Sequence, residues 1–293
     1  MCGIIAYIGS ENCNNDIFDK LLLSNMIRGL DATGVVDIKN NTCYKKVGNA
    51  MVFLNWYKET RKNTNFVIGH TRDASLKTMV DDVNNAHPFD TTHVIGVHNG
   101  FIKNNWEINR DLFNYETELK HNVDSNDFYR ILDKGIEKNQ DNHIDIVTKI
   151  LSLLEGSFAL VFYIKNKNKK NLYISRNFER PLYYAPTKNG MYISSIRDSL
   201  NQISEPVTFE PDYLYTINNN GTIESTIPVI MKKKEEVVQY KSPYALSNHN
   251  SNNNYAPYYS NTKHYIPENN TPIIKIEPTV IKTDRLFTPS QIS

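Results

Sequence analysis

Cysteine is the second residue of the chain, directly after a methionine. Cysteine is small enough for the methionine before it to be trimmed, and we expect Met1 to be removed. The thiol and a free α-amine would then belong to one residue, Cys2. An α-amine has an unperturbed pKa of about 7.7–8.0, so it can accept the thiol proton and later return it to a leaving amine. The position therefore predicts a nucleophile that needs no histidine; the simpler alternative for Cys2 is a buried strand residue.

Six short motifs rich in glycine and polar residues follow in order along the chain. They are Met1-Cys2-Gly3-Ile4, RG-x-D-x-x-G at 28–34, GHTR at 69–72, NAHPF at 85–89, VHNG-x-I-x-N at 97–104, and Asp124-Ser125. Each motif alone has a simple structural interpretation. Asn-Gly is typical of a tight turn, and an arginine or aspartate often forms only a surface ion pair.

In this order and spacing the motifs resemble those of class II glutamine amidotransferases. These are the N-terminal-nucleophile glutaminase domains of glutamine–fructose-6-phosphate aminotransferase, amidophosphoribosyltransferase and asparagine synthetase. The resemblance covers residues 2–225, and the HTR, NAHP and VHNG series is closest to the sugar-phosphate branch. Asp124-Ser125 and the series Arg176…Arg180-Pro181-Leu182 are also seen in the phosphoribosyl branch. The resemblance implies an α+β fold: a four-layer αββα sandwich of two antiparallel sheets.

The resemblance also implies a reaction. Cys2 would release ammonia from L-glutamine through a thioester intermediate, with no cofactor and no metal. Thiolate attack on an amide creates a tetrahedral oxyanion, and each donor placed to stabilise it is worth about 3 kcal/mol of barrier. In the family these donors are an asparagine side chain and the next glycine N–H, which correspond here to Asn99 and Gly100.

Further positions match family residues that bind glutamine or shape the site. Arg72 corresponds to the residue that clamps the α-carboxylate, for which a bidentate guanidinium is suited. Asp124 corresponds to the residue that binds the α-ammonium. Thr71 and Ser75 are also assigned to substrate binding. The positions assigned to site shaping are Arg28, Asp31 and His98, and structural hydrogen bonds are expected for Thr71, His87 and His98.

One loop departs from the family pattern. The sugar-phosphate branch usually reads HTRWAT-H-G where this chain has HTRDASLK at 70–77. Asp73 replaces the aromatic residue, the glycine is absent, and Ser75 keeps the hydroxyl. The departure leaves glutamine affinity and loop closure open, but not the nucleophile or the oxyanion donors.

The elements that must position these residues follow the order strand, helix, strand. Apolar runs predict strands at 2–8, 66–69 and 94–97 and a hairpin at 35–38 and 43–47, and two of these strands end in polar clusters, where sites are usually built. Helical spacing predicts helices at 16–26, 106–113, 128–136 (capped by Ser125) and 144–154. Strands return at 158–164, 172–175, 182–185, 191–194 and 213–217. This order favours antiparallel sheets covered by helices.

Composition divides the chain into a glutaminase domain at 1–231 and a low-complexity tail at 232–293. The tail contains the asparagine-rich segment 247–254 and recurring prolines, and it lacks the apolar residues that would offset its ordering entropy. We expect the tail to be largely disordered, with a docking segment at 273–281.

The bulk composition argues against several other classes of protein. A net charge of +1 gives no reason to expect a nucleic-acid or membrane partner, and no apolar run approaches membrane-spanning length. The three cysteines lack metal-ligand spacing, as do the histidines at 70, 87 and 98. A reducing, cytoplasmic setting fits best, which would be the host cytoplasm if the protein is viral.

The chain shows no motif of an ammonia-using domain, neither a P-loop nor a Ser-Gly-Gly-x-Asp-Ser loop. We therefore expect a separate synthase protein to take the ammonia. An alternative is a stand-alone γ-glutamyl amidohydrolase, since the change at Asp73 could admit another amine substituent. A third possibility is a non-catalytic interaction module of the same fold.

Overall fold

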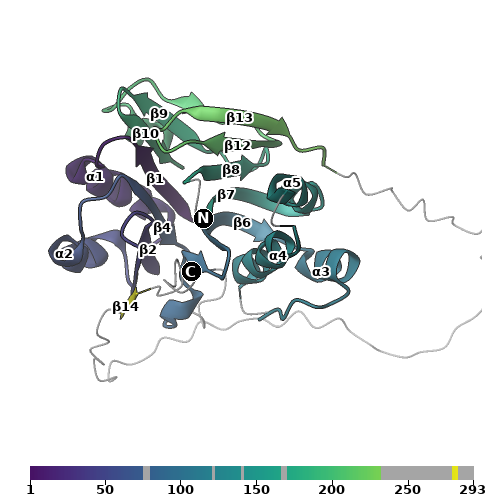
Figure 1. Cartoon of the computed structure of the whole chain (residues 1–293). Helices are drawn as coiled ribbons and strands as arrows, with labels where there is room; N and C mark the ends of the chain where they lie inside the picture. Colours follow the sequence, from purple (N-terminus) through teal and green to yellow (C-terminus); the bar gives the residue numbers. More distant parts are fainter. Residues whose placement is uncertain (75–79, 121–122, 140–141, 166–169, 232–278, 283–293) are drawn as a thin grey trace, which may run out of the picture. The chain divides into compact units, whose positions relative to one another are not determined.

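Strand β1 (Gly3–Gly9) is buried on both faces. Side chains alternate between the two faces of a strand, so Ile4 and Ile8 pack into one apolar core and Ile5 and Tyr7 pack into another. A strand with apolar side chains on both faces needs a layer of structure on each side. In the computed structural model these layers are a second antiparallel sheet on one side and helices on the other (Figure 1). The structure describes residues 1–74, 80–120, 123–139, 142–165, 170–231 and 279–282.

The first sheet has β1 near its middle, between β10 and β4, and all its described pairings are antiparallel. Its strands in spatial order are β11 (Val207–Thr208), β9 (Tyr183–Thr187), β10 (Gly190–Ser194), β1, β4 (Phe66–Arg72), β2 (Ala32–Asp37), β3 (Thr42–Val47) and β14 (Thr279–Lys282).

The second sheet is also antiparallel throughout its described pairings. Its strands in spatial order are β13 (Ile223–Pro228), β12 (Tyr213–Ile217), β8 (Leu172–Arg176), β7 (Gly156–Ile164), β6 (Val94–Ile102) and β5 (Phe89–Asp90). The core between the sheets contains Ile4 and Ile68 from the first sheet and Val97 and Val161 from the second.

Helices cover the outer face of each sheet (Figure 1). The helices on the first sheet are α1 (Asn15–Asn25) and α2 (Ala50–Thr60), whose Phe18 and Phe53 pack against the strands. Those on the second sheet are α3 (Asn105–Phe113), α4 (Asp124–Lys138) and α5 (His143–Ser152). Three single-turn 3₁₀ helices are η1 (Met26–Arg28), η3 (Val83–Asn85) and η5 (Arg197–Leu200). The four-layer αββα sandwich predicted from the sequence is confirmed.

Several elements differ from their predicted form. Strands β4 and β6 do not end at residues 69 and 97 but continue through the polar clusters, because the backbone still pairs there: Thr71 lies opposite Gly3, and Asn99 opposite Ala159. Helix α2 and strand β13 were not predicted. Ser125 is not a helix cap, since α4 already begins at Asp124 and Ser125 is its second residue.

Strand β14 pairs antiparallel with β3 and overlaps the predicted docking segment at 273–281. The other tail residues, 232–278 and 283–293, lie outside the described residues, so their predicted disorder and the division into two domains stay predictions. Among the helices that the structure describes, none is both long and apolar enough to cross a membrane.

Candidate active site

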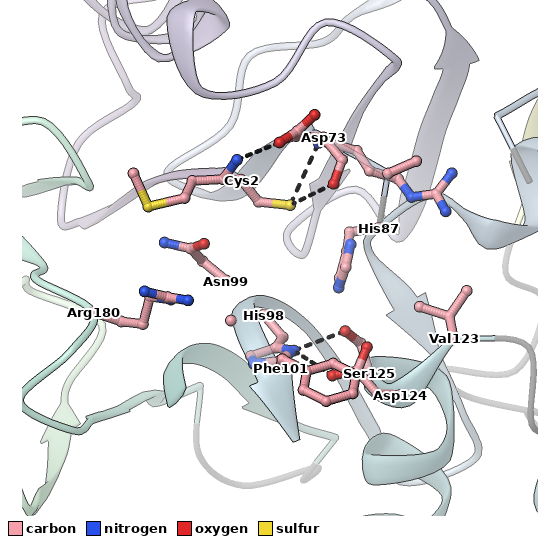
Figure 2. Close-up of a pocket in the computed structure, with 14 residues that line it drawn as sticks. Cys2, Asp73, His87, His98, Asn99, Phe101, Val123, Asp124, Ser125 and Arg180 are labelled. Carbon is pink, nitrogen blue, oxygen red and sulfur yellow. Dashed lines mark hydrogen bonds and ion pairs between the residues drawn. The ribbon is translucent and has the colours of Figure 1, made fainter. Parts of the chain in front are cut away.

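A cavity of about 560 Å³ lies where the chain terminus meets strand β6 and the start of α4 (Figure 2). Its lining brings together residues from six separate segments of the chain. They are Met1, Cys2, Arg72, Asp73, Ala74, His87, His98, Asn99, Gly100, Phe101, Val123, Asp124, Ser125 and Arg180. Five predicted site residues meet here in addition to His98: Cys2, Arg72, Asn99, Gly100 and Asp124.

Cys2 immediately precedes β1 and points its thiol toward the loop after β4. Its Sγ lies 3.4 Å from the backbone N–H of Asp73, which donates to it, and the Nε of Arg28 donates to the Cys2 carbonyl at 2.9 Å. Burial raises the pKa of the thiol above its ordinary value, although the Asp73 N–H, the terminal ammonium and Arg72 act in the other direction. At neutral pH this thiol is therefore protonated and needs a base to become a nucleophile.

Met1 also lines the cavity, and its ammonium forms an ion pair with the carboxylate of Asp73. While Met1 is present, the nitrogen of Cys2 is an amide and has no basicity to offer. The carboxylate of Asp73 therefore marks a place beside the thiol where a chain-terminal amine is bound (Figure 2).

Asn99 and Gly100 lie in consecutive positions of β6. The Asn99 side chain is buried, and its Nδ2 has no hydrogen-bond partner among the described residues. Gly100 has a φ of +146°, and a Cβ placed there would come within 1.9 Å of the Ser157 carbonyl oxygen. Only glycine fits this backbone, and Asn99 and Gly100 both line the cavity.

His98, Asp124 and Ser125 form a group at the start of α4. The Nδ1 of His98 lies 2.7 Å from the hydroxyl of Ser125 and 3.8 Å from the Asp124 carboxylate, which accepts the N–H of Ile102 at 2.8 Å. Burial lowers the pKa of His98, with Asp124 acting in the opposite direction. The imidazole therefore acts as a neutral link between β6 and the helix that carries Asp124.

Strand β4 ends with Arg72, whose carbonyl accepts the N–H of Asp31 at 3.0 Å. The Asp31 carboxylate accepts the N–H of Ala74 at 2.7 Å, which holds the backbone that follows Arg72 and contacts the thiol. Thr71 is placed differently: its buried hydroxyl donates to the Asn25 carbonyl at 2.8 Å, and it does not line the cavity. Ser75 lies outside the described residues.

Some lining residues were not predicted as site residues. Arg180 was noted only as part of a motif, and Asp73 only as a departure from the family pattern. His87 was expected to make structural hydrogen bonds, yet neither of its ring nitrogens has a partner among the described residues. Its ring packs instead at 4.0 Å from that of His70, and burial lowers the pKa of both. No group of three or more potential ligands for a metal ion is found in the described segments.

Known proteins similar to this chain point to one family. A family of glutamine amidotransferase domains matches residues 73–202, a region that contains Asn99, Gly100, Asp124 and Arg180. Glutamine–fructose-6-phosphate aminotransferase of Pyrococcus horikoshii is 28% identical over 246 residues, covering 80% of this chain and 39% of the relative. The enzyme of the same name from Thermococcus kodakarensis is 30% identical over 225 residues, covering 74% of this chain and 36% of the relative. The chain thus spans about two fifths of the length of these relatives.

Solved structures show the same fold. Glutamine phosphoribosylpyrophosphate amidotransferase from B. subtilis superimposes with a TM-score of 0.64 at 18% identity, covering 79% of this chain and 50% of the other. The sequence relatives, the domain match and this fold agree with the motifs that meet in the cavity. Residues 73–202 of this chain thus match the family of glutamine amidotransferase domains, and the described residues have the fold of a solved glutamine phosphoribosylpyrophosphate amidotransferase.

Proposed function

We propose that this chain, once Met1 is removed, releases ammonia from the side chain of L-glutamine with Cys2 as the nucleophile. One observation carries the proposal: Cys2 and Asn99 line the same cavity, and the Nδ2 of Asn99 has no hydrogen-bond partner among the described residues. The names of the sequence relatives, which are glutamine-dependent aminotransferases, support glutamine as the substrate.

The first half of the reaction forms a thioester. The α-amine of Cys2 takes the proton from Sγ, directly or through water, because burial keeps the thiol protonated at neutral pH. The thiolate attacks the amide carbon, and the oxyanion accepts hydrogen bonds from Asn99 Nδ2 and the N–H of Gly100. The carbon–nitrogen bond then breaks, and the ammonium of Cys2 returns its proton to the leaving ammonia.

The second half of the reaction regenerates the thiol. Water attacks the thioester, with the Cys2 amine accepting its proton, and the same two donors stabilise the second oxyanion. Glutamate leaves after the carbon–sulfur bond breaks and the thiol regains its proton. Arg72 would bind the α-carboxylate throughout, and Asp124, held by the Ile102 N–H, would bind the α-ammonium.

We propose that the released ammonia passes to a separate synthase protein, which uses it. The sequence relatives are named as glutamine–fructose-6-phosphate aminotransferases, which supports transfer of the ammonia to an acceptor. A reducing compartment such as the cytoplasm would suit an enzyme that depends on a thiol, and the three cysteines are free in the structure.

Processing of the N-terminus gives the sharpest test. We would compare chains that begin at Cys2 with chains that keep a tag no protease can remove, and measure glutamate release from glutamine. Activity should appear only when Cys2 is the first residue, because an amide nitrogen cannot act as the base. A matched control carries the same tag behind a protease site, so that cleavage exposes Cys2 and should restore activity. Full turnover by the folded, permanently tagged chain would rule out this mechanism.

Labelling identifies the nucleophile independently. A glutamine-like diazo-ketone should modify Cys2 but neither Cys13 nor Cys43, since Cys13 and Cys43 are buried and do not line the cavity, and burial raises their pKa values to about 12 and about 11. Intact mass should show the loss of one methionine and the addition of one label. The variant Cys2→Ala should be inactive and unlabelled, whereas Cys43→Ala should behave like the parent protein.

A further inference from the structure

We propose that Arg180 binds a carboxylate on the leaving amine, so that the site cleaves γ-glutamyl amides of amino acids in addition to glutamine. The inference rests on the proposed function, and it names a substrate class for the same site. It also gives a physical basis for choosing between a pure glutaminase and a broader γ-glutamyl amidohydrolase.

Arg180 lines the cavity from the loop between β8 and β9. Figure 2 shows its side chain on the same side of the cavity as Asn99, away from His87 and Val123. The positive charge of Arg180 contributes to the lowered pKa of His98, the residue before Asn99 in β6. The guanidinium is therefore close to the oxyanion donors.

The backbone of this loop is held in place by a second arginine. The N–H of Arg180 donates to the Asn177 carbonyl at 3.3 Å, and the carbonyl of Arg180 accepts from Nη1 of Arg176 at the same distance. Arg176 is itself buried, and its Nε donates to the Phe209 carbonyl at 2.7 Å. The loop thus gives Arg180 a fixed starting point from which its side chain enters the cavity.

The guanidinium of Arg180 forms no ion pair with any described residue. Among the residues that the structure describes, its Nε is buried without a hydrogen-bond partner, and its Nη1 donates to the Glu179 carbonyl at 3.3 Å. A second guanidinium, that of Arg28, lies close enough for Arg180 to contribute to its lowered pKa, behind the larger effect of burial. Arg180 is half-buried, and a buried donor such as its Nε is costly to leave unpaired, so this side of the cavity favours an incoming anion.

Glutamine does not supply that anion. Within the described part of the chain, the charged side chains lining the cavity are Arg72, Asp73, Asp124 and Arg180. In the structure Asp73 binds the chain-terminal ammonium, while Arg72 and Asp124 are assigned to the carboxylate and ammonium of the glutamyl group. No charged group of glutamine is assigned to Arg180. A substrate with one additional negative charge would provide a group for Arg180 to bind.

The geometry of the intermediate indicates where that charge lies. The tetrahedral carbon is bonded to Sγ of Cys2, to the oxyanion held by Asn99, and to the glutamyl chain that extends toward Arg72 and Asp124. The leaving nitrogen takes the remaining direction, and a substituent of a few atoms on that nitrogen would reach Arg180 beside Asn99 (Figure 2). A cavity of about 560 Å³ among the described residues falls within the range that holds drug-sized ligands, roughly 300–1,000 Å³, so a substituent on the nitrogen has room.

The chemistry needs no further reagent. The bond between the γ-carbonyl carbon and the substituted nitrogen breaks, and the ammonium of Cys2 protonates the leaving amine, which departs as a free amino acid. Water then cleaves the thioester to glutamate. The net reaction is hydrolysis of one amide bond, with the same proton transfers as for glutamine.

The experiment compares γ-glutamylglycine with γ-glutamylglycinamide, which have the same shape but differ by one negative charge. For chains beginning at Cys2, kcat/KM should favour γ-glutamylglycine by about 10-fold or more, the usual scale for a charge-assisted hydrogen bond. In Arg180→Gln the ratio should fall close to one, and Arg180→Lys should keep part of it. Arg72→Lys is the matched control: it should weaken both substrates and glutamine alike and leave the ratio in place.

The outcomes separate this proposal from the proposed function. A parent protein that cleaves glutamine without preferring the charged dipeptide, or a preference that survives in Arg180→Gln, would overturn the role of Arg180 alone. An equal loss for all three substrates in Arg180→Gln would place Arg180 on the glutamyl group and overturn the inference as well. Failure to cleave any of the three by the correctly processed chain would instead overturn the proposed function.

Discussion

At the scale of single residues, several buried polar atoms around this cavity have no hydrogen-bond partner among the described residues. The Nδ2 of Asn99, the Nε of Arg180, the Nε2 of His98 and both ring nitrogens of His87 lack hydrogen bonds within the described residues. Most buried polar atoms in folded proteins are satisfied, because leaving one unpaired costs about 1–3 kcal/mol. Such atoms around one thiol are what a site requires if its donors are to be completed by substrate.

Asn99→Ala tests the most specific of these assignments. We expect kcat for glutamine to fall about 100-fold or more, the usual cost of losing one oxyanion donor, while the protein remains folded. Steady-state kinetics with a thermal-unfolding scan would measure both. Asn104→Ala is the matched control, because among the described residues the Asn104 amide bonds backbone groups, donating to the Leu153 carbonyl and accepting from the Glu155 N–H. It should lower stability more than kcat. A nearly unchanged kcat in Asn99→Ala would reduce Asn99 to a structural residue.

At the scale of elements, strands β4 and β6 are longer than their apolar runs predict, and the additional residues are polar residues of the site. The runs at 66–69 and 94–97 predicted strand ends, because polar residues follow each of them. In the structure both strands continue, since their neighbours supply backbone partners whatever the side chains are. Hydrophobic patterning reports which faces are buried in apolar cores, and it cannot report strands that border a polar cavity.

Helix starts were also harder to predict than helix existence. Helix α4 was expected to follow a Ser125 cap, yet Ser125 bonds to His98 and the helix begins at Asp124. A serine near a helix start can satisfy a backbone N–H or a distant side chain, and local sequence does not distinguish the two. The missed helix α2 is different: Ala50, Phe53, Leu54 and Tyr57 have the spacing of a buried face, so its signal was present.

Asp31 holds the backbone that follows strand β4, because its carboxylate accepts a hydrogen bond from the N–H of Ala74. In Asp31→Ala we expect KM for glutamine to rise about 10-fold, the scale of a lost hydrogen bond to a charged group, because the backbone around Arg72 and Asp73 loses its anchor. Initial-rate kinetics would measure the change, and Asp16→Ala, at an exposed helix start, serves as the control. Equal KM values in both variants would contradict the anchoring role.

At the scale of the whole molecule, the fold brings together residues that no local pattern connects. Cys2, Asn99 and Asp124 were predictable because they belong to short motifs with a recognisable order. Arg180 was not assigned a role, because its position in the cavity depends on β8 and β9 belonging to different sheets, with Arg180 in the loop between them. Loops that meet through sheet topology are invisible to spacing along the chain.

Three histidines buried beside the cavity make the whole fold sensitive to acid. Burial lowers the pKa of His70 to about 3, and it lowers those of His87 and His98 as well. An unfolded histidine has a pKa of about 6.5, so below that pH the unfolded chain binds more protons than the folded one. Stability is therefore complete above about pH 6.5 and decreases as the pH falls from there toward 3.

Urea unfolding at pH 7.5 and 5.0, at constant ionic strength, measures this effect. With 1.36 kcal/mol per pKa unit, His70 alone should cost about 2 kcal/mol at pH 5.0, a large part of the roughly 5–15 kcal/mol that stabilises a typical domain. In His70→Asn the difference between the two pH values should shrink by about that amount, whatever the variant's stability at pH 7.5. The difference is diagnostic because an asparagine cannot gain a proton in this range. An identical pH dependence in both proteins would show that His70 is protonated in the folded state, and its bond to the His98 carbonyl would then need to be assigned to an imidazolium.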